Sequence, residues 1–220
     1  MKKVVIQGIQ LFFVIMFLVL IGSILFTPTI SFFKLNKFLV LLLAILLFLF
    51  FLFFYRWLKA RDFSDHISLV ILAMLFLVFL LLQLCACYYL RVNPTWDFGS
   101  VFNGASNYAL NGDIGPISCY LGDFPNNIAL FSILVILFKI ALFLGITDLF
   151  AVGIIWNCIM IDLTVIFLVY FIRKKTGNAN AILCALLCLF VAPLYLYSPI
   201  FYTDTLTLIF PIFCIYLYYE

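Results

Sequence analysis

The sequence predicts an all-α fold: a polytopic transmembrane helical bundle with an external loop that carries amphipathic interfacial helices. Hydrophobic residues make up 68% of the 220 positions, charged residues only 10%, and the mean hydropathy is +1.32. A soluble domain of this size cannot bury so much apolar surface. The apolar runs are continuous over roughly 16 to 24 residues without alternation, which indicates helices rather than barrel strands. Helices also satisfy the backbone polar groups in lipid.

The chain is expected to form a single membrane domain, 1–220, with several spans. Its N-terminus is basic and is followed by an apolar core without a small-x-small cleavage site, so we expect this segment to stay as a signal anchor. The expected spans are about 4–26, 38–55, 67–90, 150–172, 181–198 and 206–219.

Positive charges orient these spans. Lys2 and Lys3 place the N-terminus in the cytoplasm, and after two crossings the cationic loop 56–66 is cytoplasmic again. The polar loop 91–127 then lies on the non-cytoplasmic side. The next cationic cluster, 173–175, is also expected inside, which requires an odd number of crossings after the loop.

The apolar stretch 128–145 decides this count. It holds Lys139 near its middle, and a lysine at that depth costs a few kcal/mol on insertion scales. We therefore expect an interfacial or re-entrant helix here, with a full span as the alternative. On this topology the segment 199–205 reaches the same side as the polar loop. The competing topology separates them.

The external loop, 91–127, carries three carboxylates. Connections between packed elements are usually a few residues long, so a loop of this length and acidity indicates a function. Apolar residues at helical spacing after Trp96 predict an amphipathic helix on the membrane surface. Asp97 begins that helix, where the helix dipole favours a carboxylate, so it is either a helix cap or a catalytic group. The apolar positions are Phe98, Val101, Phe102, Ala105, Tyr108 and Ala109.

The other two loop carboxylates also have structural interpretations. The run 111–113, Asn-Gly-Asp, is typical of a turn, and we assign Asp113 to that turn alone. Asp123 precedes a helix that a proline can open and that Asn126 or Asn127 can cap. It either marks this helix start or points into an external cleft.

Two further carboxylates lie near or within the later spans. Asp204 is flanked by tyrosine and threonine hydroxyls, and it is either an interfacial cap or part of a site for sugar or phosphate. Asp162 lies inside a span, where a carboxylate needs a partner. We expect it to be structural, with Asn157 or Lys139 as that partner. Six of the seven cysteines lie in or beside apolar spans and are expected to pack as small apolar residues rather than to bind metal.

The order of these features resembles the GT-C superfamily of integral membrane glycosyltransferases, in its bacterial mannosyltransferase-like and protein-mannosyltransferase-like branch. The likeness covers roughly residues 85–210. Such enzymes usually have more spans, so the chain is expected to correspond to their N-terminal part. The matching elements are Trp96-Asp97 in a long first external loop, the Phe-Pro-Asn-Asn-Ile run 124–128 before an apolar helix with Phe138-Lys139, an Asp-bearing span ending in Arg-Lys-Lys, and Ser-Pro-Ile-Phe-Tyr-Thr-Asp-Thr at 198–205.

The resemblance implies transfer of a sugar from a polyprenyl-phosphate donor to a sugar or protein acceptor, on the non-cytoplasmic face of the cell membrane and with inversion. The family's first-loop aspartate maps onto Asp97, which would take the acceptor's proton or help hold a divalent metal where one is used. Inverting displacement needs such a base, and the departing phosphate needs donors. The expected catalytic residues are Asp97, Asp123 and Asp204; the expected substrate-binding residues are Arg91, for the phosphate, with Trp96, Tyr108, Asn126, Asn127 and Tyr202.

A second class of protein stays open. A small transporter or an assembly subunit without enzymatic activity would use Asp162 and Lys139 within the bundle. Membrane lipid is a partner on either interpretation, and we expect no nucleic-acid partner.

Overall fold

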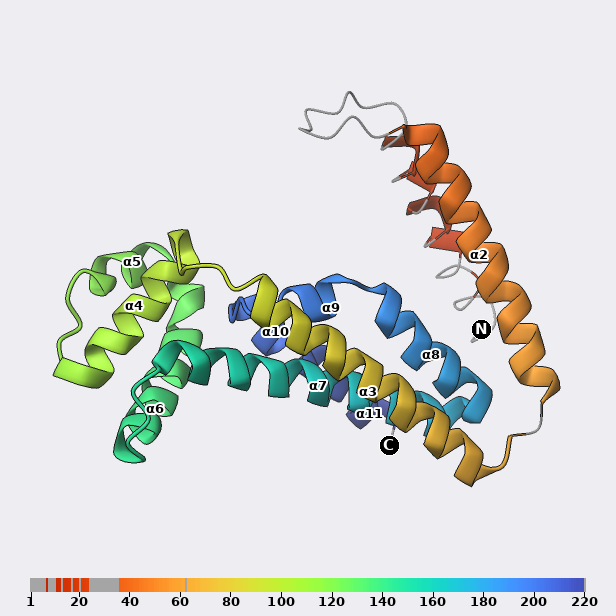
Figure 1. The fold of residues 1–220 in the computed structure, drawn as a ribbon. Coiled ribbons are helices and arrows are strands. Elements are labelled where there is room, and N and C mark those ends of the chain that lie inside the picture. The colour runs from red at the N-terminus through yellow and green to blue at the C-terminus, as the bar shows by residue number, and fades with distance from the viewer. Residues whose placement is uncertain are drawn as a thin grey trace. The chain divides into compact units, whose positions relative to one another are not determined.

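The structure is a computed structural model that describes residues 7, 11–12, 14–16, 18–19, 21–23, 36–61 and 63–219. The predicted fold class is confirmed: the structure is 84% helical, and the described residues include no strand (Figure 1). The chain divides into two compact units, 1–60 and 61–220. The first unit contains α2, and the predicted span 4–26 lies for the most part outside the described residues.

Four helical stretches in the described part of the chain are long and apolar enough to cross a membrane. They are α2, α3, α7 and the stretch Pro125–Phe143, which combines a 3₁₀ turn, η1, with α6. The structure thus indicates a multi-pass membrane protein, whereas its orientation stays a prediction. The helices are α2 (Lys37–Ala60), α3 (Asp65–Tyr89), α4 (Trp96–Asn111), α5 (Ile117–Asp123), η1 (Pro125–Asn127), α6 (Ile128–Phe143), α7 (Leu149–Thr176), α8 (Asn178–Phe190), α9 (Pro193–Leu196), α10 (Thr203–Thr207) and α11 (Ile209–Tyr219).

Helix α7 is the longest element of the second unit, and local chemistry sets both of its ends. Asp148 caps its N-terminus by accepting a hydrogen bond from the Ala151 N–H at 3.0 Å. The cations at 173–175 fill its last turn, where they complement the helix dipole, and Gly177 ends it with a φ of 93°. Its 28 residues span about 42 Å, enough to cross a bilayer.

The amphipathic helix predicted in the external loop is present as α4. Val101 and Ala105 are fully buried, and the other predicted apolar positions pack partly buried against the same core. The helix ends at Gly112, whose φ of 72° is in the left-handed region that suits glycine. Figure 1 shows α4 and α5 together at one end of the second unit, away from the α7–α8 turn.

Helix α6 packs chiefly against α4 and less against α7. In Figure 1 it runs at a steep angle to α7 instead of lying alongside it. The stretch Pro125–Phe143 nevertheless has the length and composition of a span. Lys139 is exposed, and its ammonium lies 5.0 Å from the centre of the Tyr108 ring on α4. The interfacial placement of this stretch stays a prediction.

The expected span 181–198 is interrupted. Helix α8 ends at Phe190 and the short α9 follows, so the chain leaves helical geometry between them. The Nδ2 group of Asn157, which is fully buried on α7, donates to the carbonyl oxygens of Tyr197, Ser198 and Ile200 at 3.0–3.2 Å. This one side chain satisfies backbone groups that the broken helix leaves without helical partners.

A cluster of aromatic rings holds the next residues against α4 and α7. The fully buried ring of Phe201 contacts Phe98 and Phe102 on α4 and Phe150 on α7, with ring centres 4.9–5.7 Å apart. Gly153 on α7 makes this position possible, because a Cβ atom there would overlap the Phe201 ring.

Candidate functional site

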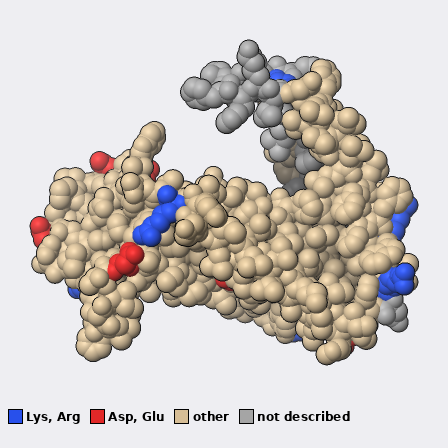
Figure 2. All heavy atoms as spheres, viewed as in Figure 1, with Lys and Arg blue, Asp and Glu red and all other residues tan. Residues whose placement is uncertain are grey.

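The structure brings the external loop and the segment 199–205 together at the N-terminal end of α7. Phe98 and Phe201 are in edge-to-face contact, and the hydroxyl oxygens of Tyr120 and Tyr202 lie 3.4 Å apart. The two segments expected to share a side of the membrane are thus in contact within the second unit, whereas the side on which they lie stays a prediction. Figure 2 shows acidic side chains at the end of the second unit that holds α4 and α5. Asp97 and Asp123 belong to these two helices, and Asp113 lies in the turn between them.

Asp97 lies in the first turn of α4 and is exposed. The capping position belongs to Thr95, whose side chain makes no capping hydrogen bond, so Asp97 is not the N-cap residue. Trp96 adopts a φ of 57°, an unusual value for a bulky residue, and its side chain is 91% exposed. Such strain costs on the order of 1–3 kcal/mol and is concentrated at functional sites.

The backbone before Asp97 is held in place by close packing. A Cβ atom on Gly99 would lie 2.8 Å from the carbonyl carbon and oxygen of Pro94, so only glycine allows the chain to fold back this tightly. The turn 94–99 thus presents the carboxylate of Asp97 in a defined position at the start of α4.

Tyr120, on α5, links the carboxylate to the rest of the site. Its hydroxyl oxygen accepts a hydrogen bond of 2.8 Å from Nδ2 of Asn127, which is almost completely buried. Burial, the Tyr202 hydroxyl and the nearby charge of Asp97 together raise the pKa of Tyr120. The phenol therefore stays protonated at neutral pH. Because its oxygen accepts from Asn127, its O–H can donate to Asp97 or Tyr202. We call these four residues the Asp97 cluster.

A pocket of about 330 Å³ lies beside this cluster, between α4 and α5, and polar side chains interrupt its largely apolar lining. Ser100, Asn103 and Asn107 line it from α4, at positions three or four residues apart, and Tyr120 lines it from α5. None of its lining residues is charged. Amide and hydroxyl groups in such an arrangement suit a ligand rich in hydroxyl groups.

Arg91, the residue expected to bind the donor phosphate, contacts the N-terminal end of α7. Its Nη2 lies 3.7 Å from Oδ1 of Asp148, and its guanidinium lies 4.5 Å from the centre of the Phe150 ring. Both partners belong to the N-terminal end of α7, so Arg91 ties the start of the loop to that helix. Its side chain is 47% exposed, which leaves it accessible to an anion.

The remaining predicted site residues are spread over the same end of the molecule. Asp123 ends α5 and Asp204 lies in the first turn of α10; both are exposed, and within the described residues no hydrogen bond or ion pair joins either one to Asp97. Asn126 is exposed in η1, and Tyr108 packs against Phe131 on α6. Their assigned roles stay predictions.

Asp113 has the turn geometry expected for it. Its Oδ1 accepts a hydrogen bond of 2.9 Å from the N–H of Gly115, two residues further on. Its carbonyl oxygen accepts from Nδ2 of Asn107 at 3.1 Å. Asp113 thus stabilises the α4–α5 turn and serves as a control position.

Asp162 has a different neighbour from the two expected. Asn157 bonds the 197–200 carbonyls and Lys139 lies over Tyr108, whereas the Asp162 carboxyl faces the amide of Gln83 on α3. Oδ1 of Asp162 and Nε2 of Gln83 have no hydrogen-bond partner among the described residues. One helical turn away, the Sγ atoms of Cys87 and Cys158 lie 3.7 Å apart.

Sequence reasoning missed four residues of this site. Ser100, Asn103 and Asn107 carried a signal, since they share the polar side of an amphipathic helix that Asp97 begins. Tyr120 carried none, because its role depends on contacts with distant segments. In the described part of the chain, no group of three or more His, Cys, Asp or Glu side chains is placed to hold a metal ion.

Comparisons with protein-family models, with curated proteins and with solved structures found no match for this chain.

Proposed function

We propose that this protein is a membrane glycosyltransferase that transfers a sugar from a polyprenyl-phosphate donor to an acceptor on the non-cytoplasmic side. The observation that carries the proposal is the Asp97 cluster, in which a carboxylate, two tyrosine hydroxyls and a buried amide from three chain segments meet beside an uncharged pocket. The resemblance to the GT-C superfamily supplies the reaction class.

In the proposed reaction an acceptor hydroxyl attacks the anomeric carbon of the donor sugar. The bond from that carbon to the phosphate oxygen breaks, and its electron pair leaves with the lipid phosphate. Asp97 takes the proton of the attacking hydroxyl, which is the role of a general base. The exposure of the Asp97 carboxylate supports this role, since the acceptor can reach it from solvent. Its neighbour Tyr120 lines the pocket between α4 and α5.

The other groups of the site bind and orient. Tyr120 stays protonated and can donate to Asp97 or Tyr202, while the amide of Asn127 donates to the phenol oxygen and holds the ring in place. Ser100, Asn103 and Asn107 offer hydrogen bonds to sugar hydroxyls. Arg91 is the cation proposed for the departing phosphate, which needs charge-assisted hydrogen bonds. Its ion pair with Asp148 is long and exposed, so phosphate can compete for it.

The test is transfer by the purified full chain in liposomes. A panel of polyprenyl-phosphate monosaccharides is offered as donors, each with a labelled sugar, together with sugar and peptide acceptors. We expect turnover with at least one donor and release of the polyprenyl phosphate. The enzymatic role is contradicted when both the chain and an Asp97→Asn variant bind the donor and neither transfers sugar.

One observation favours a second candidate, a proton-coupled carrier. Asp162 and Gln83 face each other between two candidate spans and hold unpartnered polar atoms. Ionisable residues in such places mark proton relays in transporters. Lys139, however, lies over Tyr108 and does not contact Asp162, so the two residues expected to act together are apart. The enzymatic candidate is better supported because it uses several segments that meet.

A further inference from the structure

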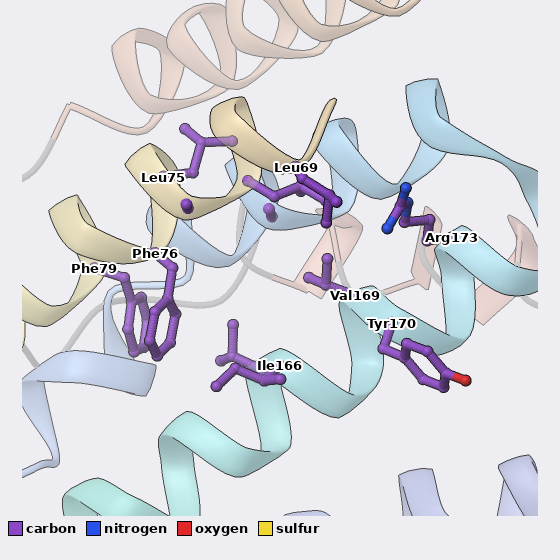
Figure 3. Close-up of a pocket in the computed structure, with 12 residues that line it drawn as sticks. Leu69, Leu75, Phe76, Phe79, Ile166, Val169, Tyr170 and Arg173 are labelled. Carbon is purple, nitrogen blue, oxygen red and sulfur yellow. The ribbon is translucent and has the colours of Figure 1, made fainter. Parts of the chain in front are cut away.

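An apolar groove runs between α3, α7 and α8, at the end of the second unit away from the Asp97 cluster. Leu69, Ala73, Phe76 and Phe79 line it from α3, with Ile166 and Val169 among the lining residues from α7. Its volume is about 320 Å³. Figure 3 shows Phe76 and Phe79 toward one end of the groove and Arg173 at the other. Because α3 and α7 are candidate spans, the apolar lining of the groove suits an acyl chain of a bilayer.

A polar pocket continues the groove at the Arg173 end. Tyr170 and Arg173 line both, and Lys174 and Gly177 line the polar pocket alone. Two cations, Arg173 and Lys174, and one carboxylate, Asp65, line this pocket, so its net charge is positive. An apolar groove that ends in a cationic pocket matches a lipid with an anionic headgroup.

Two hydrogen bonds hold the guanidinium of Arg173 in place, and they do not use all of its N–H groups. Its Nε donates to Oδ1 of Asn178 at 2.9 Å, and its Nη2 to Oδ1 of Asp65 at 3.0 Å. These contacts use two of its three nitrogens, and Nη1 carries two further N–H groups. Asp65 is 83% exposed, so an anion can replace it, whereas the Arg173 side chain is 25% exposed and stays in the pocket.

The N-terminus of α8 adds a second anion-binding feature. Gly177 occupies the capping position without a side-chain hydrogen bond, and it lines the polar pocket. The first N–H groups of this 13-residue helix therefore lack a side-chain acceptor, which is the arrangement that binds phosphate at helix N-termini. A Cβ atom at Gly177 would meet nothing within 4 Å, so there is room beside these groups.

We propose that the α3–α7 groove and its polar pocket bind one anionic phospholipid of the bilayer, with an acyl chain in the groove and the phosphate between Arg173, Lys174 and the N-terminus of α8. The site is independent of the proposed glycosyl transfer, since none of its residues belongs to the Asp97 cluster. The lipid would hold α3, α7 and α8 together at this end of the unit.

The test measures lipid affinity of the purified full chain by native mass spectrometry. Phosphatidylglycerol and phosphatidylcholine with the same acyl chains are titrated separately, and glycerol phosphate serves as a headgroup without tails. We expect phosphatidylglycerol to bind at least about fivefold more tightly than phosphatidylcholine, since each cation near an anionic lipid contributes about 1 kcal/mol. Glycerol phosphate should bind far more weakly than either lipid.

Variants separate the headgroup contact from the tail contact. Arg173→Gln should remove the preference for phosphatidylglycerol, whereas Lys139→Gln, the same charge change on α6, should leave it. Asp65→Asn should strengthen phosphatidylglycerol binding because it removes the competing carboxylate; this result does not depend on whether Arg173→Gln folds. Ala73→Trp should weaken both lipids by filling the groove. Equal affinities for the two lipids, or no effect of Arg173→Gln and Asp65→Asn, overturns the proposal.

Discussion

The hydroxyl oxygens of Tyr120 and Tyr202 lie 3.4 Å apart, although 82 positions separate the two residues in the chain. Tyr120 belongs to the short helix α5 of the external loop, and Tyr202 directly precedes α10. Their contact joins the two polar segments on which the proposed reaction depends. The charge of Asp97, on α4, also raises the pKa of the Tyr120 phenol. Three chain segments therefore meet at one hydroxyl group.

The first prediction concerns Asp97. Asp97→Asn should reduce transfer by about 10²- to 10⁴-fold, because the amide cannot accept a proton at neutral pH. Folded yield should stay at the wild-type level, since the cap position belongs to Thr95 and the side chain is exposed. Steady-state transfer rates with a radiolabelled donor, together with donor binding, measure the effect.

Asp113→Asn is the matched control for that experiment. It removes the same charge from the same loop, but Asp113 serves the turn before α5, where asparagine also fits. Its transfer rate should remain close to wild type. Full activity of Asp97→Asn would remove the residue on which the mechanism rests.

The second prediction concerns topology. Single cysteines introduced by Ser100→Cys and Thr203→Cys, in a chain without native cysteines, should both react with an impermeant maleimide added to intact cells. The cationic loops at 56–61 and 173–175 should stay inside, which places both sites outside. A cysteine at Lys174 should react only after the cells are opened. Labelling of only one of the two outer positions contradicts the shared site.

The third prediction concerns Gly153. Gly153→Ala should lower the free energy of unfolding by about 1–3 kcal/mol, since the new Cβ overlaps the Phe201 ring and overpacking of a fitted contact has this cost. The loss should extend to transfer activity, because Phe201 positions Tyr202. Denaturation of the purified protein in mixed micelles measures the stability.

Two further variants make this prediction specific. Phe201→Leu combined with Gly153→Ala should recover part of the lost stability, as coupled neighbours do in a double-mutant cycle. Gly122→Ala, where a Cβ meets nothing within 4 Å, should change stability little. Equal losses at Gly153 and Gly122 would show that the Phe201 contact is not the cause.

The fourth prediction concerns Asp162. Asp162→Asn should leave folded yield nearly unchanged, since Oδ1 of Asp162 has no hydrogen-bond partner among the described residues and hydrogen bonds between membrane helices average only about 0.6 kcal/mol. Size-exclusion profiles in detergent measure the yield. A variant that folds normally but loses proton-driven uptake in proteoliposomes would instead support the carrier.

The fifth prediction concerns the packing of α3 on α7. In a chain that keeps only Cys87 and Cys158, mild oxidation by a small disulfide reagent should join the two sulfur atoms, which lie 3.7 Å apart. The reagent is reduced to two thiols as the bond forms. A chain that keeps only Cys85 and Cys158 should react much less, because Cys85 is exposed elsewhere on α3. Peptide mapping without reduction detects the product, and equal cross-linking in both chains contradicts this packing.

Sequence reasoning was most successful where one local pattern decides the outcome. The long apolar runs predicted α2, α3 and α7, and the spacing of Val101 and Ala105 predicted α4. It did not predict the break after α8, because apolar residues continue on both sides of it. The partner of Asp162 and the role of Tyr120 were missed, since the register between distant helices decides both.

Asn157 has a consequence for how the chain enters the membrane. Helices α8 and α11 have only 13 and 11 residues, and the carbonyls of the broken stretch between α8 and α10 depend on a donor from α7. We therefore expect the C-terminal part of the chain to leave the insertion machinery only against an α7 that is already in place. A substitution at Asn157 should then lower the amount of protein that accumulates in the membrane, because misassembled chains are degraded during biogenesis.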